Sequence, residues 1–325
     1  MDSILIDESI FDEAFIPERL VSREGQIKEI ARCLAPAKVG KSIRNLLVVG
    51  QPGVGKTIVC RWILKEHFPK HSVFLSAWSK RTSHKVIEEI LLQLGLVVHG
   101  KESTSELVKK IEKSGRKILV CIDEADHLKD SDILYVLARN NCGIILISNE
   151  AFLSNTDSRI TDRLFLNEIE FKPYSKDEIF DILKERVSCG LRPNTVSDSL
   201  LSIISGMCNG DARIGLQTLR VAAKDAESKG LEKITIEEIK AAAKCARKYR
   251  MSYLLGKLNE HQRVIYEILK KKVRIASGKL YEEYSKVASE PVVDRAYRNY
   301  MKTMVELGLI KVEGSGRWKI YEISI

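Results

Sequence analysis

The chain has 325 residues, of which 44% are hydrophobic, and this size predicts two or three globular domains with apolar cores. No apolar run is long enough to span a membrane, and the seven scattered cysteines form no C-x-x-C pair. These features argue against membrane, disulfide-rich and zinc-finger classes, and a cytoplasmic location is expected. The net charge is +9, and residues 250–325, with 15 Lys and Arg against 9 Asp and Glu, carry +6 of it. This excess indicates a polyanionic partner, although a solubilising surface would give the same count.

The first predicted element is a lead-in segment, residues 16–24, followed by a helix to about Leu34. A proline fixes a bend in this segment, and Ile16, Leu20 and Val21 surround the bend. Because the segment lies just upstream of a phosphate-binding motif, these three side chains are predicted to line a pocket for a nucleotide base. A role in packing alone is the alternative.

Residues 50–57 form the central motif, Gly-Gln-Pro-Gly-Val-Gly-Lys-Thr, which is the G-x-x-x-x-G-K-T pattern of a phosphate-binding loop. A predicted buried strand, residues 46–49, precedes it, and a helix begins at Lys56, a context that a chance Gly-rich turn would lack. Glycines let the backbone approach phosphates, and N–H groups at a helix N-terminus face the anion. Lys56 is predicted to reach the β- and γ-phosphates, and the Thr57 hydroxyl to ligate Mg²⁺. The predicted contacts with ATP or ADP in this motif are Gly53, Val54, Gly55, Lys56, Thr57 and Ile58.

A second motif follows the apolar run of residues 118–122, where Asp123 and Glu124 end a predicted strand. The carboxyl ends of parallel strands meet at one edge of a sheet, where ligands bind. Asp123 is therefore predicted to hold Mg²⁺, and Glu124 to orient or deprotonate the attacking water. Acids that only cap the next helix are the alternative. The predicted neighbouring elements are a strand over residues 72–76 and helices over 83–94, 103–113 and 131–139.

Two more predicted strands, residues 143–149 and 168–171, complete an α/β fold around a five-stranded parallel sheet. Asn149 ends the first of them and is predicted to contact the γ-phosphate or the lytic water. Arg159 and Arg163 precede the second and are predicted to reach a nucleotide on a neighbouring protomer. Surface arginines in a loop are the alternative.

The pattern after Pro173 is helical, with an Arg213 that is predicted to reach the γ-phosphate from a lid over the nucleotide. Ser175 and Glu178 have the spacing of a capping box at the start of the first helix. The predicted lid helices cover residues 175–189, 196–208, 212–228 and 235–249.

The last part of the chain predicts three helices, over residues 259–272, 277–287 and 291–307, and two strands, over 309–312 and 318–323. This order is typical of a winged helix, a relative of the helix-turn-helix. At about 100° per residue, one arc of the third helix carries cations and an amide without an acid. The opposite side, predicted to face the core, carries Val293, Tyr297, Tyr300, Met304 and Leu307. The predicted DNA contacts are Arg295, Arg298, Asn299, Lys302 and, at the hairpin tip, Arg317, although exposed helix faces are commonly charged.

The ordered set of motifs resembles that of the archaeal replication initiators related to the origin recognition complex and cell division control ATPases, within the AAA+ class. The resemblance implies an AAA+ core over residues 1–173, a helical lid over 174–250 and a winged-helix DNA-binding domain over 251–325. It implies ATP-dependent binding of origin DNA, with bound ATP or ADP acting as a switch and only weak ATPase turnover. The matching blocks are residues 17–24, 50–57, 121–128, 133–139, 147–149, 171–174 and 210–213.

The resemblance also implies roles for single residues. Asn149 and Arg213 would be the two sensors of the γ-phosphate, Tyr174 and Arg186 would contact the nucleotide, and Arg159 or Arg163 would be the arginine finger. Double-stranded origin DNA, other initiator protomers and the replicative helicase are the expected partners, without a membrane, so the location would be on the nucleoid. The stretch between Ser76 and Ser83 is compact for the family, and DNA contact there is left open for four basic residues, Lys80, Arg81, His84 and Lys85.

Three alternatives remain. A clamp-loader-like or regulatory AAA+ ATPase would use the C-terminal domain as a protein-interaction module, but clamp-loader subunits lack a C-terminal winged helix. A signalling NTPase usually has a His or Pro motif where this chain has Gly-Asp-Ala-Arg at 210–213. A paralogue that binds DNA without hydrolysing ATP is disfavoured by the intact Asp123 and Glu124.

Overall fold

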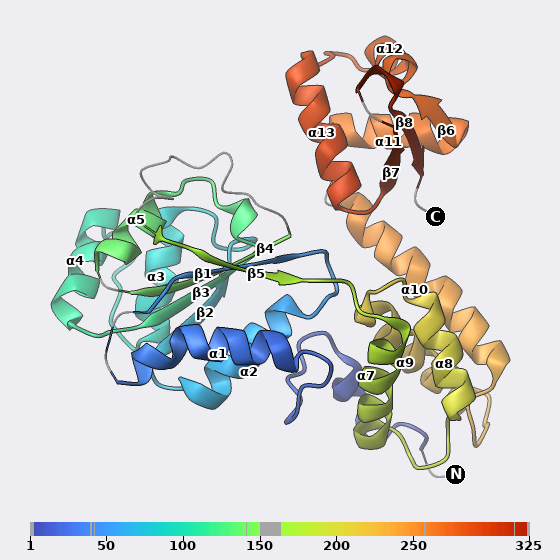
Figure 1. Cartoon of the computed structure of the whole chain (residues 1–325), viewed down its shortest axis with the longest axis horizontal. Coiled ribbons are helices and arrows are strands. Elements are labelled where there is room, and N and C mark those ends of the chain that lie inside the picture. The colour runs from blue at the N-terminus through green and yellow to red at the C-terminus, as the bar shows by residue number, and fades with distance from the viewer. Residues whose placement is uncertain are drawn as a thin grey trace.

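Five parallel strands form the central sheet of the N-terminal part of the molecule, at the left of Figure 1. Their order in the sheet is β2-β3-β4-β1-β5, so β1 lies between β4 and β5. The bounds are Leu46–Gly50 (β1), Ser72–Ser76 (β2), Leu119–Asp123 (β3), Gly143–Ser148 (β4) and Asn167–Phe171 (β5). Each lies within one residue of the predicted strand, so the five-stranded parallel sheet is confirmed. The computed structural model describes residues 3–39, 41, 43–140, 142–149, 164–256, 258–314 and 316–323.

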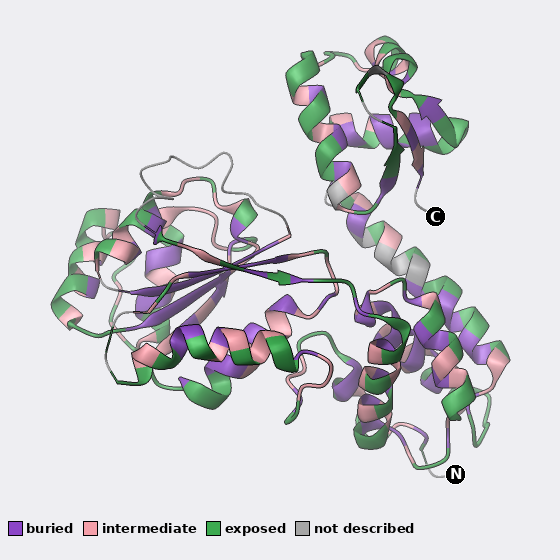
Figure 2. Ribbon diagram, in the orientation of Figure 1, coloured by how far each residue is buried: buried purple, intermediate pink, exposed green. Residues whose placement is uncertain are grey.

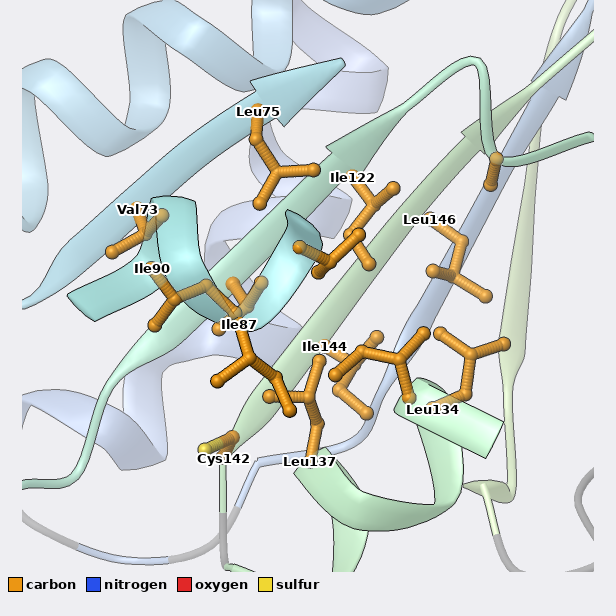
Figure 3. Close-up of a cluster of buried hydrophobic side chains, with 14 of the residues drawn as sticks. Val73, Leu75, Ile87, Ile90, Ile122, Leu134, Leu137, Cys142, Ile144 and Leu146 are labelled. Atoms are coloured by element: carbon orange, nitrogen blue, oxygen red, sulfur yellow. The ribbon is translucent and has the colours of Figure 1, made fainter. Parts of the chain in front are cut away.

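Helices cover both faces of the sheet, which is why its three inner strands, β3, β4 and β1, are almost entirely apolar and buried, whereas the edge strand β5 has two exposed glutamates (Figure 2). Along β1, Leu46 and Val48 pack with α1 and α2, whereas Leu47 and Val49 face the layer of α3, α4 and α5. Figure 3 shows the second layer, in which Ile87 and Ile90 of α3 approach the sheet. The helices are α1 (Glu24–Lys38), α2 (Lys56–His67), α3 (Ser83–Gln93), α4 (Thr104–Ser114) and α5 (Asp132–Arg139).

The lid follows β5 and is helical, as predicted. Its helices are α7 (Lys176–Gly190), α8 (Asp198–Met207), α9 (Ala212–Ser228) and the first part of α10 (Ile236–Gly256). The predicted capping box is present, because the Ser175 hydroxyl accepts from the N–H of Glu178 and the Glu178 carboxylate accepts from the N–H of Ser175. The N-terminal segment packs into the same core through Ile4, Ile10 and Phe11, the last two in the 3-10 helix η1 (Glu8–Phe11).

Two helices are longer than predicted. α1 continues past Leu34 to Lys38 and includes Pro36 in its last turn, although this proline lacks the N–H that would bond to the carbonyl one turn earlier. α10 continues past Tyr249 to Gly256, because Leu254 at its end packs into the core of the C-terminal domain. One unbroken helix therefore joins the lid to the C-terminal domain (Figure 1).

The C-terminal domain has the helices and strands of a winged helix. Its elements are α11 (Glu260–Lys272), β6 (Arg274–Ala276), α12 (Ser277–Val287), α13 (Asp294–Glu306), β7 (Ile310–Glu313), η4 (Gly316–Trp318) and β8 (Ile320–Ile323). The strands form an antiparallel sheet in the order β6-β8-β7. The sequence did not predict β6, because three residues are too few to show a strand period. Within the described residues, no helix combines the length and the apolar character needed to cross a bilayer.

The predicted core side of α13 is correct for Tyr297 and Met304, which are buried. The prediction for Val293 is wrong, because this side chain is 73% exposed. Val293 is the extended N-cap residue that precedes the helix, so the helical projection does not apply to it.

Candidate nucleotide-binding site

The carboxyl ends of neighbouring strands bring polar side chains to one edge of the sheet. In spatial order, Ser76 ends β2, Asp123 ends β3 with Glu124 directly after it, Asn149 follows β4, and residues 51–57 follow β1. These residues come from distant parts of the chain, and the crossover helices of a parallel sheet place them side by side. This edge is where an open α/β sheet binds its ligand.

The phosphate-binding loop has the backbone that its glycines predict. Gly53 and Gly55 have φ of +82° and +89°, which other residues rarely adopt, and α2 begins directly after Gly55. The Lys56 ammonium donates to Gln51 O at 2.9 Å and to Asn149 Oδ1 at 3.2 Å. Burial lowers the pKa of Lys56 to about 8, and the nearby Asp123 carboxylate opposes this shift. The loop thus presents a buried cation and helix N–H groups to an anion.

Thr57 and Asp123, the two residues predicted to hold Mg²⁺, lie beside each other in the structure. Thr57 Oγ1 donates to Asp123 Oδ2 at 2.9 Å, so a hydroxyl and a carboxylate converge beside the phosphate-binding loop. Burial raises the pKa of Asp123, and the hydrogen bonds from Thr57 and from the Glu124 N–H oppose this shift. Both are hard oxygen ligands, which Mg²⁺ prefers together with phosphate oxygens and water. The residues present fit Mg²⁺, which would neutralise phosphate charge when bound.

Glu124 is held in a constrained position beside this site. Its φ is +53°, in the left-handed region, and Ser76 Oγ donates to its Oε2 at 3.1 Å. A residue other than glycine rarely adopts such a φ, and strained backbone of this kind is found at functional sites. Glu124 lines the cleft together with Asp123.

The lid contributes the opposite wall. Arg213, at the start of α9, lines the same cleft as Lys56 and Thr57. Tyr174 lies directly on the phosphate-binding loop, because a Cβ at Gly55 would overlap its hydroxyl. The cleft between these walls has a volume of about 840 Å³, in the range of small-molecule sites.

The N-terminal segment closes one end of the cleft. Leu20 and Val21 line it, as predicted for a base pocket, whereas Ile16 lies outside its lining. Arg186 also lines it and donates to Ile10 O at 3.0 Å. The predicted contacts in and after the phosphate-binding loop also differ, because Ile58 lines the cleft, whereas Val54 is buried and does not line it.

Ion pairs hold the N-terminal segment against α9. Glu8 pairs with Arg220 and with Lys224, the latter at 2.6 Å, and Asp12 lies 3.8 Å from Arg220. The two cations hold the pKa of Glu8 below its ordinary value. The sequence analysis missed these contacts, because the partners are about two hundred residues apart and no local pattern relates them.

Arg23 is a further functional candidate that the sequence analysis did not single out. It is 4% exposed, and its guanidinium lies 3.7 Å from the centre of the Tyr174 ring. Its Nε donates to Val54 O at 3.1 Å, and its Nη2 donates to Lys172 O at 2.7 Å. On the lid side, Nη1 lies 3.8 Å from the Glu178 carboxylate of α7. One side chain therefore joins the phosphate-binding loop, the end of β5 and the lid. The Pro-Glu-Arg-Leu block that precedes it was the available signal.

We expect Arg23→Ala to lower the free energy of unfolding by about 1–3 kcal/mol, because two main-chain carbonyls lose a charged donor. Chemical unfolding followed by fluorescence measures this change. Lys28→Ala, an exposed change on the same helix, is the control and should have little effect. Equal unfolding midpoints for the two variants would contradict the role of Arg23 as a structural link.

Three predicted residues cannot be placed. Arg159 and Arg163 lie outside the described residues, and so does the side chain of Arg317, whose backbone belongs to η4. The other predicted DNA contacts, on α13, are all exposed.

Comparison with known proteins identifies the class. A family model described as an AAA domain matches residues 40–153, and one described as a Cdc6 AAA+ ATPase-type lid domain matches residues 180–244. The chain is an AAA+ ATPase with a Cdc6-type lid.

The relatives identify the family. ORC1-type DNA replication protein 1 of Sulfurisphaera tokodaii is 30% identical, over 96% of this chain and 87% of that protein. ORC1-type DNA replication protein 9 of Halobacterium salinarum is 26% identical, over 98% and 93%. The structure of the Aeropyrum pernix ORC1 protein in complex with DNA is similar with a TM-score of 0.76 and 25% identity, over 100% of this chain and 94% of that one. The chain belongs to the ORC1-type family of DNA replication proteins, which confirms the resemblance found in the sequence.

Proposed function

We propose that the protein is a DNA replication initiator in which the bound nucleotide, ATP or ADP, sets how the C-terminal domain is presented to double-stranded origin DNA. The observation that carries this proposal is the cleft between core and lid. Lys56, Thr57, Asp123 and Glu124 line it from the core, and Arg213 lines it from the lid. A ligand that contacts both walls changes their relative positions by its differential affinity for the two arrangements.

The geometry of the cleft supports the following roles. Lys56 and the loop N–H groups would bind the β- and γ-phosphates, and Asn149, within 3.2 Å of the Lys56 ammonium, would contact the γ-phosphate or the attacking water. Glu124 would accept a proton from that water. Arg213 would contact the γ-phosphate, so that the lid responds to ATP differently from ADP.

The continuous helix α10 would transmit lid movement to the C-terminal domain. Its beginning packs in the lid core through Ile239 and Ala242, and its end packs in the C-terminal core through Leu254. A helix anchored at both ends acts as a rigid connection, so a change of lid angle would become a change in the direction of α13.

The exposed side of α13 would contact DNA. Arg295, Arg298, Asn299 and Lys302 are exposed there, and Arg and Asn are the side chains that pair with guanine and adenine edges. Trp318, 85% exposed in η4, would add a stacking surface at the wing beside Arg317. Arg298 bonds Asp294 one turn earlier, so an acid borders the face that the sequence predicted to be free of acids.

We expect Arg298→Ala to weaken binding to duplex DNA by about 1–3 kcal/mol if this side chain contacts a base. Fluorescence anisotropy of labelled duplex with the full chain, at several salt concentrations and with ATP or ADP, measures this effect. Lys270→Ala removes the same charge from the end of α11 and serves as the control, with a smaller loss expected. If wild-type affinity were independent of salt, or if the two variants were equal, the α13 face would not be the DNA-binding surface.

Further partners and the location remain part of this proposal. Arg159 or Arg163 would act on the nucleotide of a neighbouring protomer, and the replicative helicase would be a downstream partner. A location on the nucleoid in the cytoplasm fits these partners. The likeness to the DNA complex of Aeropyrum pernix ORC1 supports DNA as the first of them.

A further inference from the structure

Asp211, which none of the roles above uses, is bound closely to Arg213. Asp211 is the N-cap of α9, and its Oδ1 accepts from the Arg213 main-chain N–H at 3.0 Å. The same carboxylate also accepts from the Arg213 side chain, from Nε at 3.2 Å and from Nη2 at 3.1 Å. Both nitrogens belong to the fork of donors that a guanidinium would offer to a phosphate.

The Asp211 carboxylate is also buried against the phosphate-binding loop. Asp211 is 3% exposed, and a Cβ at Gly53 would overlap its carboxylate. A main-chain hydrogen bond also joins the start of α9 to the phosphate-binding loop, since the N–H of Ala212 donates to Gly53 O at 3.3 Å. The lid therefore places an anion and its bonded Arg213 at the edge of the site that would receive phosphates.

We propose that Asp211 is a specificity-determining residue that holds Arg213 in a carboxylate-bound position and thereby limits the preference of the site for nucleoside triphosphates over diphosphates. This inference rests on the proposed contact between Arg213 and the γ-phosphate.

The physical reason is an exchange of hydrogen bonds. To contact a γ-phosphate through Nε and Nη2, Arg213 must give up hydrogen bonds to Asp211. The free energy of these lost bonds offsets part of the binding free energy that the contact with the γ-phosphate contributes. A diphosphate has no γ-phosphate and leaves the pair intact, so the cost falls on the triphosphate alone. Glu13, 4.0 Å from Arg213 Nη1 and largely exposed, adds a weaker restraint of the same sign.

Asp211→Asn tests this proposal without removing the helix cap, because Asn is as good an N-cap as Asp and has nearly the same volume. The measured quantity is the ratio of the Kd for ADP to the Kd for a non-hydrolysable ATP analogue, obtained by calorimetry on the full chain with Mg²⁺. We expect this ratio to rise about tenfold, within the usual range of coupling between sites. Asp198→Asn, an exposed change in the first turn of α8, is the control and should leave the ratio unchanged.

A double-mutant cycle with Arg213→Ala separates this inference from the function on which it rests. Arg213→Ala alone should lower the ratio, and an unchanged ratio would overturn the proposed sensor role itself. In the Arg213→Ala background, Asp211→Asn should have no further effect. If Arg213→Ala lowers the ratio but Asp211→Asn leaves it unchanged or lowers it, only the role of Asp211 is overturned. If Asp211→Asn raised the ratio equally with and without Arg213, the Asp211 carboxylate would act by repelling the phosphate directly. That result would also overturn the proposed exchange of hydrogen bonds at Arg213.

Discussion

Glu124→Gln is expected to slow ATP hydrolysis by about 10²- to 10⁴-fold while leaving the affinity for ATP unchanged. The amide keeps the size of the side chain and can still accept the hydrogen bond from Ser76, but it cannot accept a proton from water. Nucleotide affinity should persist because Lys56, Thr57 and the loop N–H groups are untouched. Single-turnover release of phosphate measures hydrolysis, and equilibrium dialysis measures binding.

The matched control for this change is Glu66→Gln, which removes the same charge from an exposed position on α2 and should hydrolyse ATP at the wild-type rate. If Glu124→Gln also kept the wild-type rate, the group that activates water would have to be another residue. If binding were lost as well, Glu124 would be part of the binding surface rather than the general base.

Lys56→Ala is expected to weaken ATP binding by about 2–5 kcal/mol, because it removes a buried cation from the site of the β- and γ-phosphates. Lys56 is 7% exposed, so water cannot replace the lost interaction well. Equilibrium dialysis with labelled ATP measures the loss. Lys65→Ala, an exposed change on the same helix, should bind ATP like the wild type. Unchanged binding by Lys56→Ala would show that the nucleotide lies elsewhere.

The pH profile of ATP binding is a second check on Lys56. Burial lowers the pKa of this lysine to about 8, so the protonated form that attracts phosphate is lost as the pH rises above that value. Bound phosphates favour the protonated form and raise the pKa of Lys56 in the complex, so the affinity should fall as the pH rises from about 8 towards that higher pKa. Lys56→Arg stays protonated over this range and should show a flatter profile, measured in the same dialysis experiment.

The chemistry of the core edge was predictable from local sequence. The phosphate-binding loop and the Asp123–Glu124 pair are each encoded within a few residues, and each follows a strand whose apolar run is unmistakable. Parallel strands then bring the two motifs together without further information, because their carboxyl ends share one edge. The hydrogen bond from Thr57 to Asp123 is the result.

The positions of the helices in the lid and in the C-terminal domain could be predicted from the sequence. The way in which these helices pack together could not. Capping boxes and apolar periodicity located the helices, whereas the continuation of α10 past Tyr249 depended on packing at both of its ends. A helical projection gave the correct buried side for Tyr297, and it failed at Val293 because α13 begins at Asp294, three residues after the predicted start.

The sequence by itself determined the class of protein and the phosphate-binding loop, and it is the basis for proposing which residues bind Mg²⁺ and activate water, because those patterns are short and depend on backbone geometry within one turn. Only the tertiary structure decided that Arg23 joins the loop to the lid and that Arg213 is held by Asp211 against Gly53. It also decided that acidic N-terminal residues pair with α9. Such contacts join segments far apart in the chain, and their partners are selected by packing and burial rather than by spacing in the sequence.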